Sequence, residues 1–228
     1  MTDRRVTVVR DLVRRLLDDA GGTGTAPIVQ VGHPVLRATA FPCDGQLDDA
    51  DLALLVALMQ RTMRAAPGVG LAAPQIGIPL ALAVVEDPGV DDAEVARVRE
   101  RDRVPFRVLV NPAYEPVGED RVGFYEGCLS VVGYQAVVAR PRTVRLRAHD
   151  VTGAAVDEVV TGWAARIVQH ETDHLGGTLY LDRAEMRSLS ATDRLGAHWA
   201  SQPVPLEASR ALGFALPTPA GPGGAAPR

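Results

Sequence analysis

His170-Glu171-Thr172-Asp173-His174 carries two histidines four residues apart, with a glutamate directly after the first. On an α-helix, positions i and i+4 share one face, so both imidazoles can point at one metal ion. Glu171 then lies beside that ion, where it can take a proton from water. The stretch therefore predicts a helix from Trp163 to Leu175 that carries a hydrolytic metal site, and Gly176-Gly177 marks the end of that helix.

On both sides of this helix, apolar residues recur at helical or strand-like spacing between turn residues. They predict a helix over Leu47–Ala66 and strands over Ile28–Val31, Leu80–Glu86, Phe106–Val110, Gln135–Ala139, Thr143–His149 and Ala155–Val160, with Leu179–Leu181 as a last short strand. The charged stretch from Asp87 to Arg103 is expected to be an exposed excursion. Because helices and strands do not alternate regularly, we predict an α+β domain, with antiparallel β-sheets packed around the central metal-binding helix.

The two ends of the chain differ from this domain, which we expect to span residues 27–202. Residues 1–26 predict an N-terminal amphipathic helical extension, with apolar residues at helical spacing: Val6, Val9, Val13, Leu16 and Leu17. That helix can either dock on the domain or bind a partner. Residues 203–228 are rich in proline, alanine and glycine, and this tail is predicted to be disordered.

Composition bounds the class of protein. The chain has 228 residues, 46% of them hydrophobic and 23% charged, with a net charge of −4. A chain of this balance forms an ordinary globular domain, and it lacks the basic field that attracts nucleic acid or an anionic membrane. With only two cysteines, Cys43 and Cys128, no signal peptide and no long apolar run, we expect a cytoplasmic protein without a membrane span.

Two further segments carry candidate site residues. Gly68-Val69-Gly70-Leu71-Ala72-Ala73-Pro74-Gln75 can serve as a tight helix-to-strand connection. It can equally let a substrate backbone approach its glycines while Gln75 supplies an amide donor. In Glu126-Gly127-Cys128-Leu129-Ser130, the cysteine can be a metal ligand or an inert buried residue. A papain-like Cys–His pair lacks its usual local signature around Cys128.

The three segments, in this order, resemble the three signature motifs of the peptide deformylases. Those motifs are a Gly-apolar-Gly-apolar-Ala-Ala-Pro-Gln loop, a Glu-Gly-Cys-Leu-Ser segment and a His-Glu-x-Asp-His helix, and all three are complete here. The resemblance covers roughly residues 28–183, and Gly32-His33-Pro34-Val35-Leu36-Arg37 resembles the opening segment of the family. It departs after Ser130, where Val131-Val132-Gly133-Tyr134 replaces the apolar residue and proline of many members.

The resemblance implies a role for each matched residue. Cys128, His170 and His174 would hold the metal, and Glu171 would act as general base. Gln75 and the backbone N–H of Leu129 would stabilise the oxyanion, and Gly70 would offer its backbone to an extended substrate. The implied metal is Fe²⁺, with Zn²⁺ or Ni²⁺ able to substitute. The implied reaction removes the formyl group from N-formylmethionyl nascent polypeptides, with a transient ribosome contact, although the tail lacks a basic docking helix.

Helical geometry adds a candidate methionine slot. Trp163, Arg166 and Ile167 lie near the face of His170, and Val69 and Phe124 could complete an apolar slot with them. The alternative is that Trp163 and Ile167 belong to the ordinary core. Arg140 stands where the family has an arginine that pairs with the glutamate of the second motif. It would therefore anchor Glu126, unless it is a solvated surface residue.

Two other interpretations compete with this one. A zincin-type peptidase would use His170, Glu171 and His174 with a third ligand downstream, for which His198 and Glu185 are the nearest candidates. A non-catalytic protein could close a structural Cys₂His₂ site with Cys43, Cys128, His170 and His174. That second alternative leaves Glu171 and Gln75 without a role.

Overall fold

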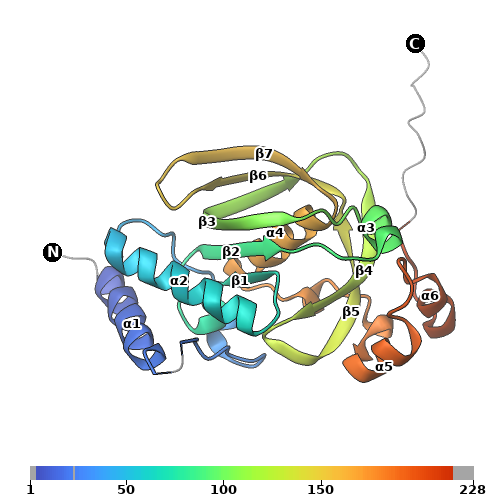
Figure 1. Ribbon diagram of the computed structural model, residues 1–228, viewed down its shortest axis with the longest axis horizontal. Helices are drawn as coiled ribbons and strands as arrows, with labels where there is room; N and C mark the ends of the chain where they lie inside the picture. The colour runs from blue at the N-terminus through green and yellow to red at the C-terminus, as the bar shows by residue number, and fades with distance from the viewer. Residues whose placement is uncertain (1–3, 23, 218–228) are drawn as a thin grey trace, which may run out of the picture.

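The computed structural model describes residues 4–22 and 24–217 and contains two antiparallel sheets (Figure 1). The larger sheet has the strand order β1-β2-β3-β6-β7. Its strands are β1 (Gly70–Ala72), β2 (Leu82–Asp87), β3 (Val104–Pro116), β6 (Thr143–His149) and β7 (Ala155–Thr161). The smaller sheet has the order β4-β5-β8, with β4 (Arg121–Cys128), β5 (Val131–Pro141) and β8 (Ser190–Ala191). The prediction of an α+β fold with antiparallel sheets around the metal-binding helix is confirmed.

Helix α4 (Gly162–Leu175) packs against the larger sheet, and its position follows from the alternation of side chains in β1 and β2. Ala72, Ala83 and Val85 face α4 and pack with Ile167 and Val168. The intervening residues face the other side of the sheet, as the period of two in a strand requires. Small residues on the α4 side let the helix approach the sheet closely, which brings its polar face near β1.

The first backbone N–H groups of α4 donate hydrogen bonds to backbone carbonyl groups of other segments. The N–H of Gly162 donates to the carbonyl of Arg142 at 2.9 Å, and the N–H of Trp163 donates to the carbonyl of Glu100 at 3.2 Å. Gly162 has a φ of +68°, and a Cβ there would lie 2.5 Å from the Cβ of Glu100. A larger residue at position 162 would therefore displace the start of the metal-binding helix.

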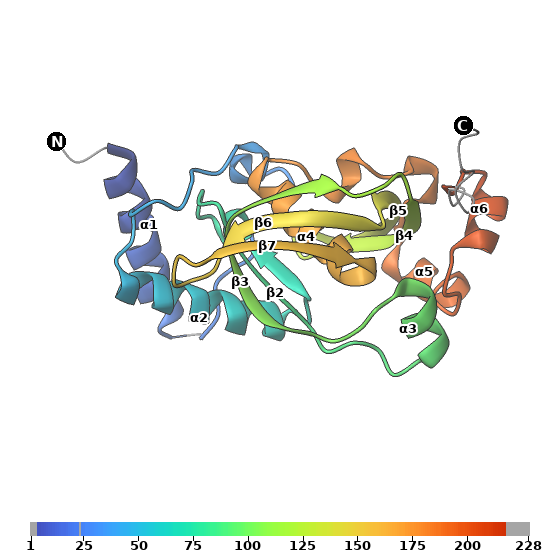
Figure 2. The same ribbon diagram turned by 90° about the horizontal axis from the view of Figure 1, so that it is seen from above.

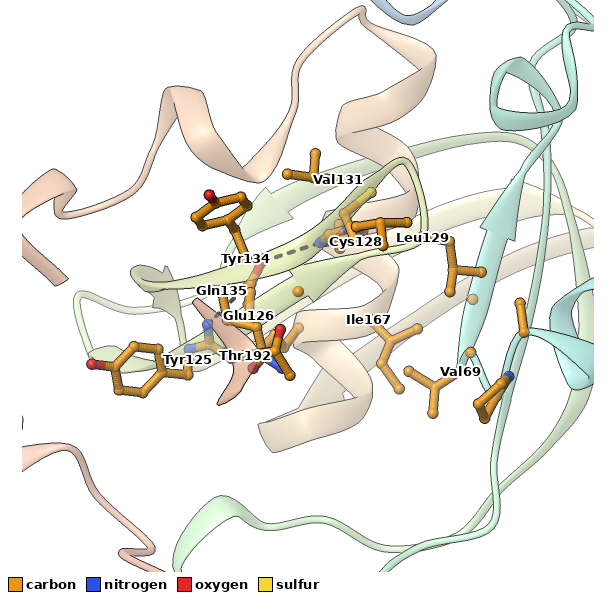
Figure 3. Close-up of a pocket in the computed structure, with 18 of the residues that line it drawn as sticks. Val69, Tyr125, Glu126, Cys128, Leu129, Val131, Tyr134, Gln135, Ile167 and Thr192 are labelled. Carbon is orange, nitrogen blue, oxygen red and sulfur yellow. Dashed lines mark hydrogen bonds and ion pairs between the residues drawn. The ribbon is translucent and has the colours of Figure 1, made fainter. Parts of the chain in front are cut away.

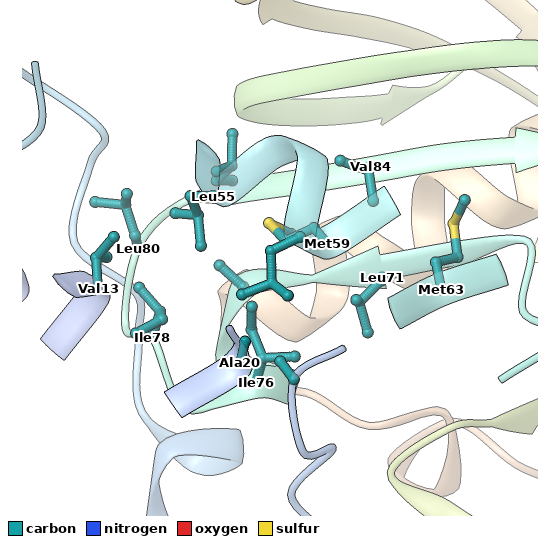
Figure 4. Close-up of a cluster of buried hydrophobic side chains, with 14 of the residues drawn as sticks. Val13, Ala20, Leu55, Met59, Met63, Leu71, Ile76, Ile78, Leu80 and Val84 are labelled. Carbon is teal, nitrogen blue, oxygen red and sulfur yellow. The ribbon is translucent and has the colours of Figure 1, made fainter. Parts of the chain in front are cut away.

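The opposite face of β1 and β2 is covered by α1 (Arg4–Ala20) and α2 (Asp49–Ala65) (Figure 4). Val9 and Val13 of α1 are fully buried against α2 residues such as Leu55 and Met59, and Leu71 and Val84 complete this core. The N-terminal helix thus docks on the domain, as one of the two sequence interpretations expected. The division of the chain at residues 26 and 202 stays a prediction.

The other end of the molecule carries α3 (Ala93–Arg99), α5 (Thr192–His198) and α6 (Leu206–Leu212) (Figure 2). The expectation of disorder from residue 203 is wrong for α6, because Ala208 and Phe214 are buried against Val137 of β5. Residues 218–228 of the predicted tail lie outside the described residues. Within the described ranges, no helix is long and apolar enough to cross a membrane.

Other local predictions need correction. Residues 28–31 do not form a strand; Val29 and Val31 instead donate single backbone hydrogen bonds to Gln75 and Ser130. Residues 179–181 enter a 3-10 helix (Tyr180–Asp182), because the Asp182 carboxylate accepts from the N–H of Leu179 at 2.8 Å. Three further 3-10 helices span Pro34–Arg37, Ala73–Ile76 and Met186–Ser188. Strand β4 was not predicted, because its two glycines weaken the strand propensity, and the segment from Asp87 to Arg103, predicted as an exposed excursion, contains the short helix α3.

Candidate active site

Three candidate metal ligands converge from two elements. His170 and His174 lie on one face of α4, with ring centroids 5.0 Å apart, and Cys128 is the last residue of β4. The Cys128 Sγ lies 3.3 Å from the Nε2 of His174, and one ligand atom from each of the three residues lies within 4.8 Å of the others. A thiolate and two imidazoles suit a divalent transition-metal ion, and three protein ligands are typical of catalytic rather than structural sites.

Cys128 reaches the helix because the β4–β5 pairing is irregular at this point. The register shifts between Gly127, which pairs with Gln135, and Cys128, which pairs with Val131. A bulge of this kind re-aims a side chain. The Sγ then accepts hydrogen bonds from the N–H of Ser130 at 3.4 Å and from the Nε2 of Gln75 at 3.5 Å. The sulfur is therefore held toward α4 by two neighbouring segments.

Glu126 orients the ring of His170 through the ring nitrogen Nδ1. Its Oε2 lies 3.1 Å from the Nδ1 of His170, which leaves the Nε2 of that ring for the metal. Arg140 donates to both Glu126 oxygens, at 2.6 and 3.0 Å, and is only 2% exposed. The prediction that Arg140 anchors Glu126 agrees with this geometry, and the alternative of a solvated surface arginine is wrong.

A second arginine shares this carboxylate. The Nη1 of Arg166 donates to the Oε1 of Glu126 at 2.5 Å and to the carbonyl of Val138 at 2.9 Å. Burial alone would raise the pKa of Glu126, but Arg140, Arg166 and His170 together hold it well below its usual range. Glu126 is therefore a carboxylate whose orientation two buried guanidinium groups fix. The sequence placed Arg166 near the methionine slot and gave no sign of this contact.

Arg140 also binds Asp173, which lies near the C-terminal end of the His170–His174 motif. Its Nη1 donates to the Oδ2 of Asp173 at 2.8 Å, and the hydroxyl of Tyr114 and a guanidinium nitrogen of Arg183 donate to the Oδ1 of Asp173, each at 2.9 Å. Asp173 lies between Glu171 and His174 in sequence, so the same arginine restrains both ends of the motif. A network in which each charge is paired supports a rigid site.

Glu171 lines the pocket beside the three candidate metal ligands. Its side chain is 4% exposed, and its Oε2 is buried without a hydrogen-bond partner among the described residues. Burial raises the pKa of Glu171 to about 7, against the opposing effects of His170 and Arg140. A buried carboxylate with a free oxygen and a raised pKa next to a metal-ligand set is a candidate general base.

Gly70 leaves the space that Glu171 occupies. A Cβ at position 70 would lie 2.2 Å from the Oε1 of Glu171 and 2.7 Å from its Cγ, closer than such atoms can approach. The glycine is therefore required by the close approach of β1 to α4, and not by a tight turn alone.

Replacing Gly70 by alanine is expected to push the Glu171 carboxylate out of position and to reduce kcat/KM by about 10²-fold, the loss that follows a misplacement of about 1 Å. Steady-state kinetics of substrate hydrolysis would measure this. Gly22→Ala is the matched control, since a Cβ there meets nothing within 4 Å. Equal kinetics for both variants would contradict a steric role for Gly70.

Gln75 is held in one orientation at the edge of the pocket. Its Oε1 accepts from the N–H of Ala72 at 2.8 Å, so its Nε2 must be the atom that points toward Cys128 and Ser130. The residue is 1% exposed and belongs to the 3-10 helix that follows β1. A fixed amide donor directed at the ligand set can stabilise a developing negative charge.

The pocket next to the metal-ligand set has a volume of about 900 Å³ (Figure 3). Val69, Gly70, Leu129, Trp163 and Ile167 line it, and Figure 3 shows Val69 and Ile167 on the side opposite Tyr134 and Gln135. Phe124 is the exception among the predicted slot residues. It packs behind Trp163, with ring centroids 6.0 Å apart, and does not line the pocket.

The residues of the two alternative sites do not join the ligand set. Among the described residues, the group able to hold a metal contains Cys128, His170 and His174, and Cys43, Glu185 and His198 are not part of it. The backbone of Cys43 instead exchanges hydrogen bonds with the side chain of Asn111. Fold and site together define a hydrolase built around a Cys-His-His metal centre.

Comparison with known proteins agrees with this class. The profile of the polypeptide deformylase family matches residues 25–190. Peptide deformylase 3 of Streptomyces avermitilis is 58% identical over 220 residues, which cover 95% of this chain and 98% of the relative. Peptide deformylase 1 of Streptomyces coelicolor is 60% identical over 197 residues, covering 86% and 90% of the two chains. The chain therefore belongs to the peptide deformylase family.

Solved structures show the same similarity. A class I type b peptide deformylase from Acinetobacter baumannii, bound to Met-Ala-Ser, has a TM-score of 0.63 at 32% identity, and the match covers 70% of this chain and 98% of that one. A peptide deformylase from Synechococcus elongatus in complex with actinonin has a TM-score of 0.60 at 34% identity, covering 83% and 89%. The chain is accordingly a metal-dependent hydrolase that removes the N-formyl group from newly made polypeptides.

Proposed function

We propose that Cys128, His170 and His174 hold Fe²⁺ and that Glu171 is the general base for removal of the formyl group. A bound divalent metal would act as a Lewis acid toward water and the formyl carbonyl. The observation that carries the proposal is the buried, unpartnered Oε2 of Glu171 beside the three ligands. Glu171 would accept a proton from the attacking water and pass it to the departing amine.

Iron is supported by the chemistry of the ligands. A thiolate is soft and donates more charge than a carboxylate, and together with two imidazoles it accommodates Fe²⁺ as well as Zn²⁺ or Ni²⁺. We expect anaerobically purified protein to contain iron and to lose activity in air, since the iron and its ligand thiolate can both be oxidised. Assay of formyl-methionyl peptide hydrolysis by protein loaded with each metal in turn tests this, and equal activity of Fe²⁺ and Zn²⁺ protein in the absence of oxygen would contradict it.

The substrate backbone would bind at β1. Among the described strands it pairs only with β2 and lies at the edge of the larger sheet, so its other edge can accept an extended peptide. Gly70 opens that strand and also lines the pocket. An extended chain held there would bring its formyl group to Glu171 and Gln75. Its methionine side chain would enter the apolar part of the pocket at Val69, Trp163 and Ile167.

Gln75 and the N–H of Leu129 would stabilise the oxyanion that forms when water attacks the formyl carbon. Gln75→Leu is expected to lower kcat by about 10²- to 10³-fold with little change in KM, because the donor acts mainly in the transition state. Gln46→Leu is the matched control. Gln46 is also a buried amide whose Oε1 accepts a nearby backbone N–H, but it lies outside the pocket. A drop in kcat of the same size in both variants would assign the Gln75 effect to stability.

The place of action follows from the substrate. Newly made formylmethionyl polypeptides emerge from ribosomes, so we propose that the protein works in the cytoplasm and contacts the ribosome transiently. The net charge of −4 favours recognition through the nascent chain over direct binding to RNA. Co-sedimentation with ribosomes that carry a formylated nascent chain, compared with empty ribosomes, tests this contact.

A further inference from the structure

Arg166 is a buried arginine to which the proposed mechanism gives no task. It lies one helical turn before His170 on α4, and both side chains contact Glu126 of β4. Its side chain is only 4% exposed, and its guanidinium carbon lies 5.2 and 5.7 Å from the ring centroids of Phe124 and Trp163. Because the site is buried and covered by aromatic rings, water screens the charge of Arg166 weakly, and that charge acts directly on Glu126.

Arg140 by itself can hold Glu126 in its orientation. Its Nε donates to the Oε1 of Glu126 at 2.6 Å and its Nη2 to the Oε2 at 3.0 Å, and such a pair of parallel hydrogen bonds fixes the plane of a carboxylate. Arg166 adds one hydrogen bond, at 2.5 Å, to the Oε1 that Arg140 already binds. What Arg166 contributes beyond Arg140 is therefore a second positive charge on the same carboxylate.

This second charge is held in an unfavourable environment. Burial, with a contribution from the nearby Arg140, lowers the pKa of Arg166 to about 10 in spite of the opposing effect of Glu126. Asp173 is the other buried carboxylate of the network, and it is already shared by Arg140 and Arg183. Groups with strongly perturbed ionisation concentrate at functional sites, so the position of Arg166 calls for a role in the chemistry of this one.

The charge of Glu126 acts on the candidate metal ligands through His170. The Oε2 of Glu126 lies 3.1 Å from the Nδ1 of His170, and a carboxylate in this position makes the opposite ring nitrogen a stronger donor to a metal. The thiolate of Cys128 also donates charge strongly. A metal ion that receives more charge from its ligands is held more tightly, but it polarises water and a carbonyl group less. A cation bound to the Oε1 of Glu126 opposes this donation.

We propose that Arg166 is a positioning residue that limits the negative charge which Glu126 presents to His170. By this route it weakens the hold of the three ligands on the metal and keeps the metal an effective Lewis acid. The inference rests on the proposed function, in which His170 binds the metal through its Nε2. It has an unusual consequence: loss of Arg166 should tighten metal binding, even though loss of one partner from a buried ionic network destabilises the fold.

Arg166→Gln tests the proposal, because glutamine removes the charge and keeps an amide donor. We expect the Kd for Ni²⁺, measured by competition with a chelator, to fall about threefold to tenfold, part of the 10–100-fold effect that the hydrogen-bond partner of a ligand histidine exerts. The kcat of the Ni²⁺-loaded protein for a formyl-methionyl peptide should fall by a similar factor. A merely structural role would raise Kd and lower kcat together. An unchanged or raised Kd would overturn the proposal.

Two further substitutions at this position separate charge from shape. Arg166→Lys keeps the positive charge and should return both Kd and kcat to near the wild-type values, whereas a lysine variant that behaves like Arg166→Gln would contradict a role for charge. Arg166→Met removes the charge with a side chain of similar length, and it provides the same test if the glutamine variant does not fold.

The route through Glu126 is tested by a double variant. In a Glu126→Gln background the carboxylate is absent, so adding Arg166→Gln should change the Kd for Ni²⁺ by less than about twofold, as expected when the coupled group has been removed. Tightening of the same size in both backgrounds would rule out this route.

Arg101→Gln is the matched control. Arg101 also lines the pocket and lies 5.1 Å from the ring centroid of Trp163, but its carboxylate partner is the buried Asp87 instead of Glu126. Its Kd for Ni²⁺ should equal that of the wild-type protein, and tightening like that of Arg166→Gln would refute the proposal. A wild-type protein that binds no Ni²⁺, Zn²⁺ or Fe²⁺ would overturn the proposed function, and this inference with it. Wild-type binding with no change in Arg166→Gln would overturn the inference alone.

Discussion

Replacing Glu171 by glutamine is expected to lower kcat for formyl-peptide hydrolysis by about 10²- to 10⁴-fold, the range for loss of a general acid–base group. Glutamine keeps the size of the side chain in a space that Gly70 leaves only just wide enough. It removes the carboxylate whose buried Oε2 has no hydrogen-bond partner among the described residues. The measurement is steady-state kinetics together with the metal content of each preparation.

Metal content should stay at the wild-type value in this variant, because Glu171 is not one of the three grouped ligands. Glu185→Gln is the control, since Glu185 is exposed and is the carboxylate that a zincin-type site would recruit. Undiminished turnover in Glu171→Gln would remove this residue from the role of base. A loss of turnover in Glu185→Gln would support the zincin-type alternative instead.

Replacing Cys128 by alanine is expected to abolish both metal retention and activity. The remaining pair of imidazoles has no third ligand among the described residues, and two protein ligands hold a divalent metal much more weakly than three. Because bound metal stabilises the folded state, a chelator should lower the Tm of the wild-type protein and leave that of Cys128→Ala unchanged. Elemental analysis and thermal unfolding with and without chelator measure these effects.

Cys43→Ala is the matched control for this experiment. Cys43 is half-buried like Cys128, and burial raises the pKa of its thiol, which disfavours the thiolate that a metal binds. The variant should keep its metal and its response to chelator. If Cys43→Ala lost metal as Cys128→Ala does, the structural Cys₂His₂ alternative would hold instead.

The network around Glu126 links β4, β5 and α4, and two of these strands and helices, β4 and α4, carry the candidate metal ligands. Arg140 and Arg166 hold the carboxylate, the carboxylate holds the ring of His170, and Arg140 also holds Asp173 within the motif. Removing one partner of such a buried network leaves an unpaired charge, which usually costs about 3–5 kcal/mol. The rigidity of the ligand set is therefore coupled to the stability of the domain.

Several features were readable from the chain alone because their cause is local. The spacing of His170 and His174 requires a helix to bring the two rings together, and that helix is α4. Apolar runs bounded by turn residues located β2, β6 and β7, and the apolar face of residues 47–66 located α2. The complete motifs around Gln75, Cys128 and His170 were sufficient to indicate the family, which the comparisons confirm.

Tertiary structure decided the features that depend on residues distant in sequence. Arg166 binds Glu126 across 40 positions, and nothing in its immediate neighbours indicates a carboxylate partner. The strand β4 exists because β5 supplies its hydrogen bonds, in spite of its glycines. The composition of the tail predicts disorder. The helix α6 is nevertheless ordered, because Ala208 and Phe214 are buried by packing against Val137.

The sequence by itself thus determined the candidate ligand set, the helix that carries two of its members, and the reaction class, since each follows from residue type and short-range spacing. The shape of the pocket was decided only by folding. Phe124 lies behind Trp163 instead of in the pocket, and α5 supplies a wall that no motif indicated. Cavity walls are formed by side chains brought together across the whole chain, and their positions depend on packing that a linear pattern does not record.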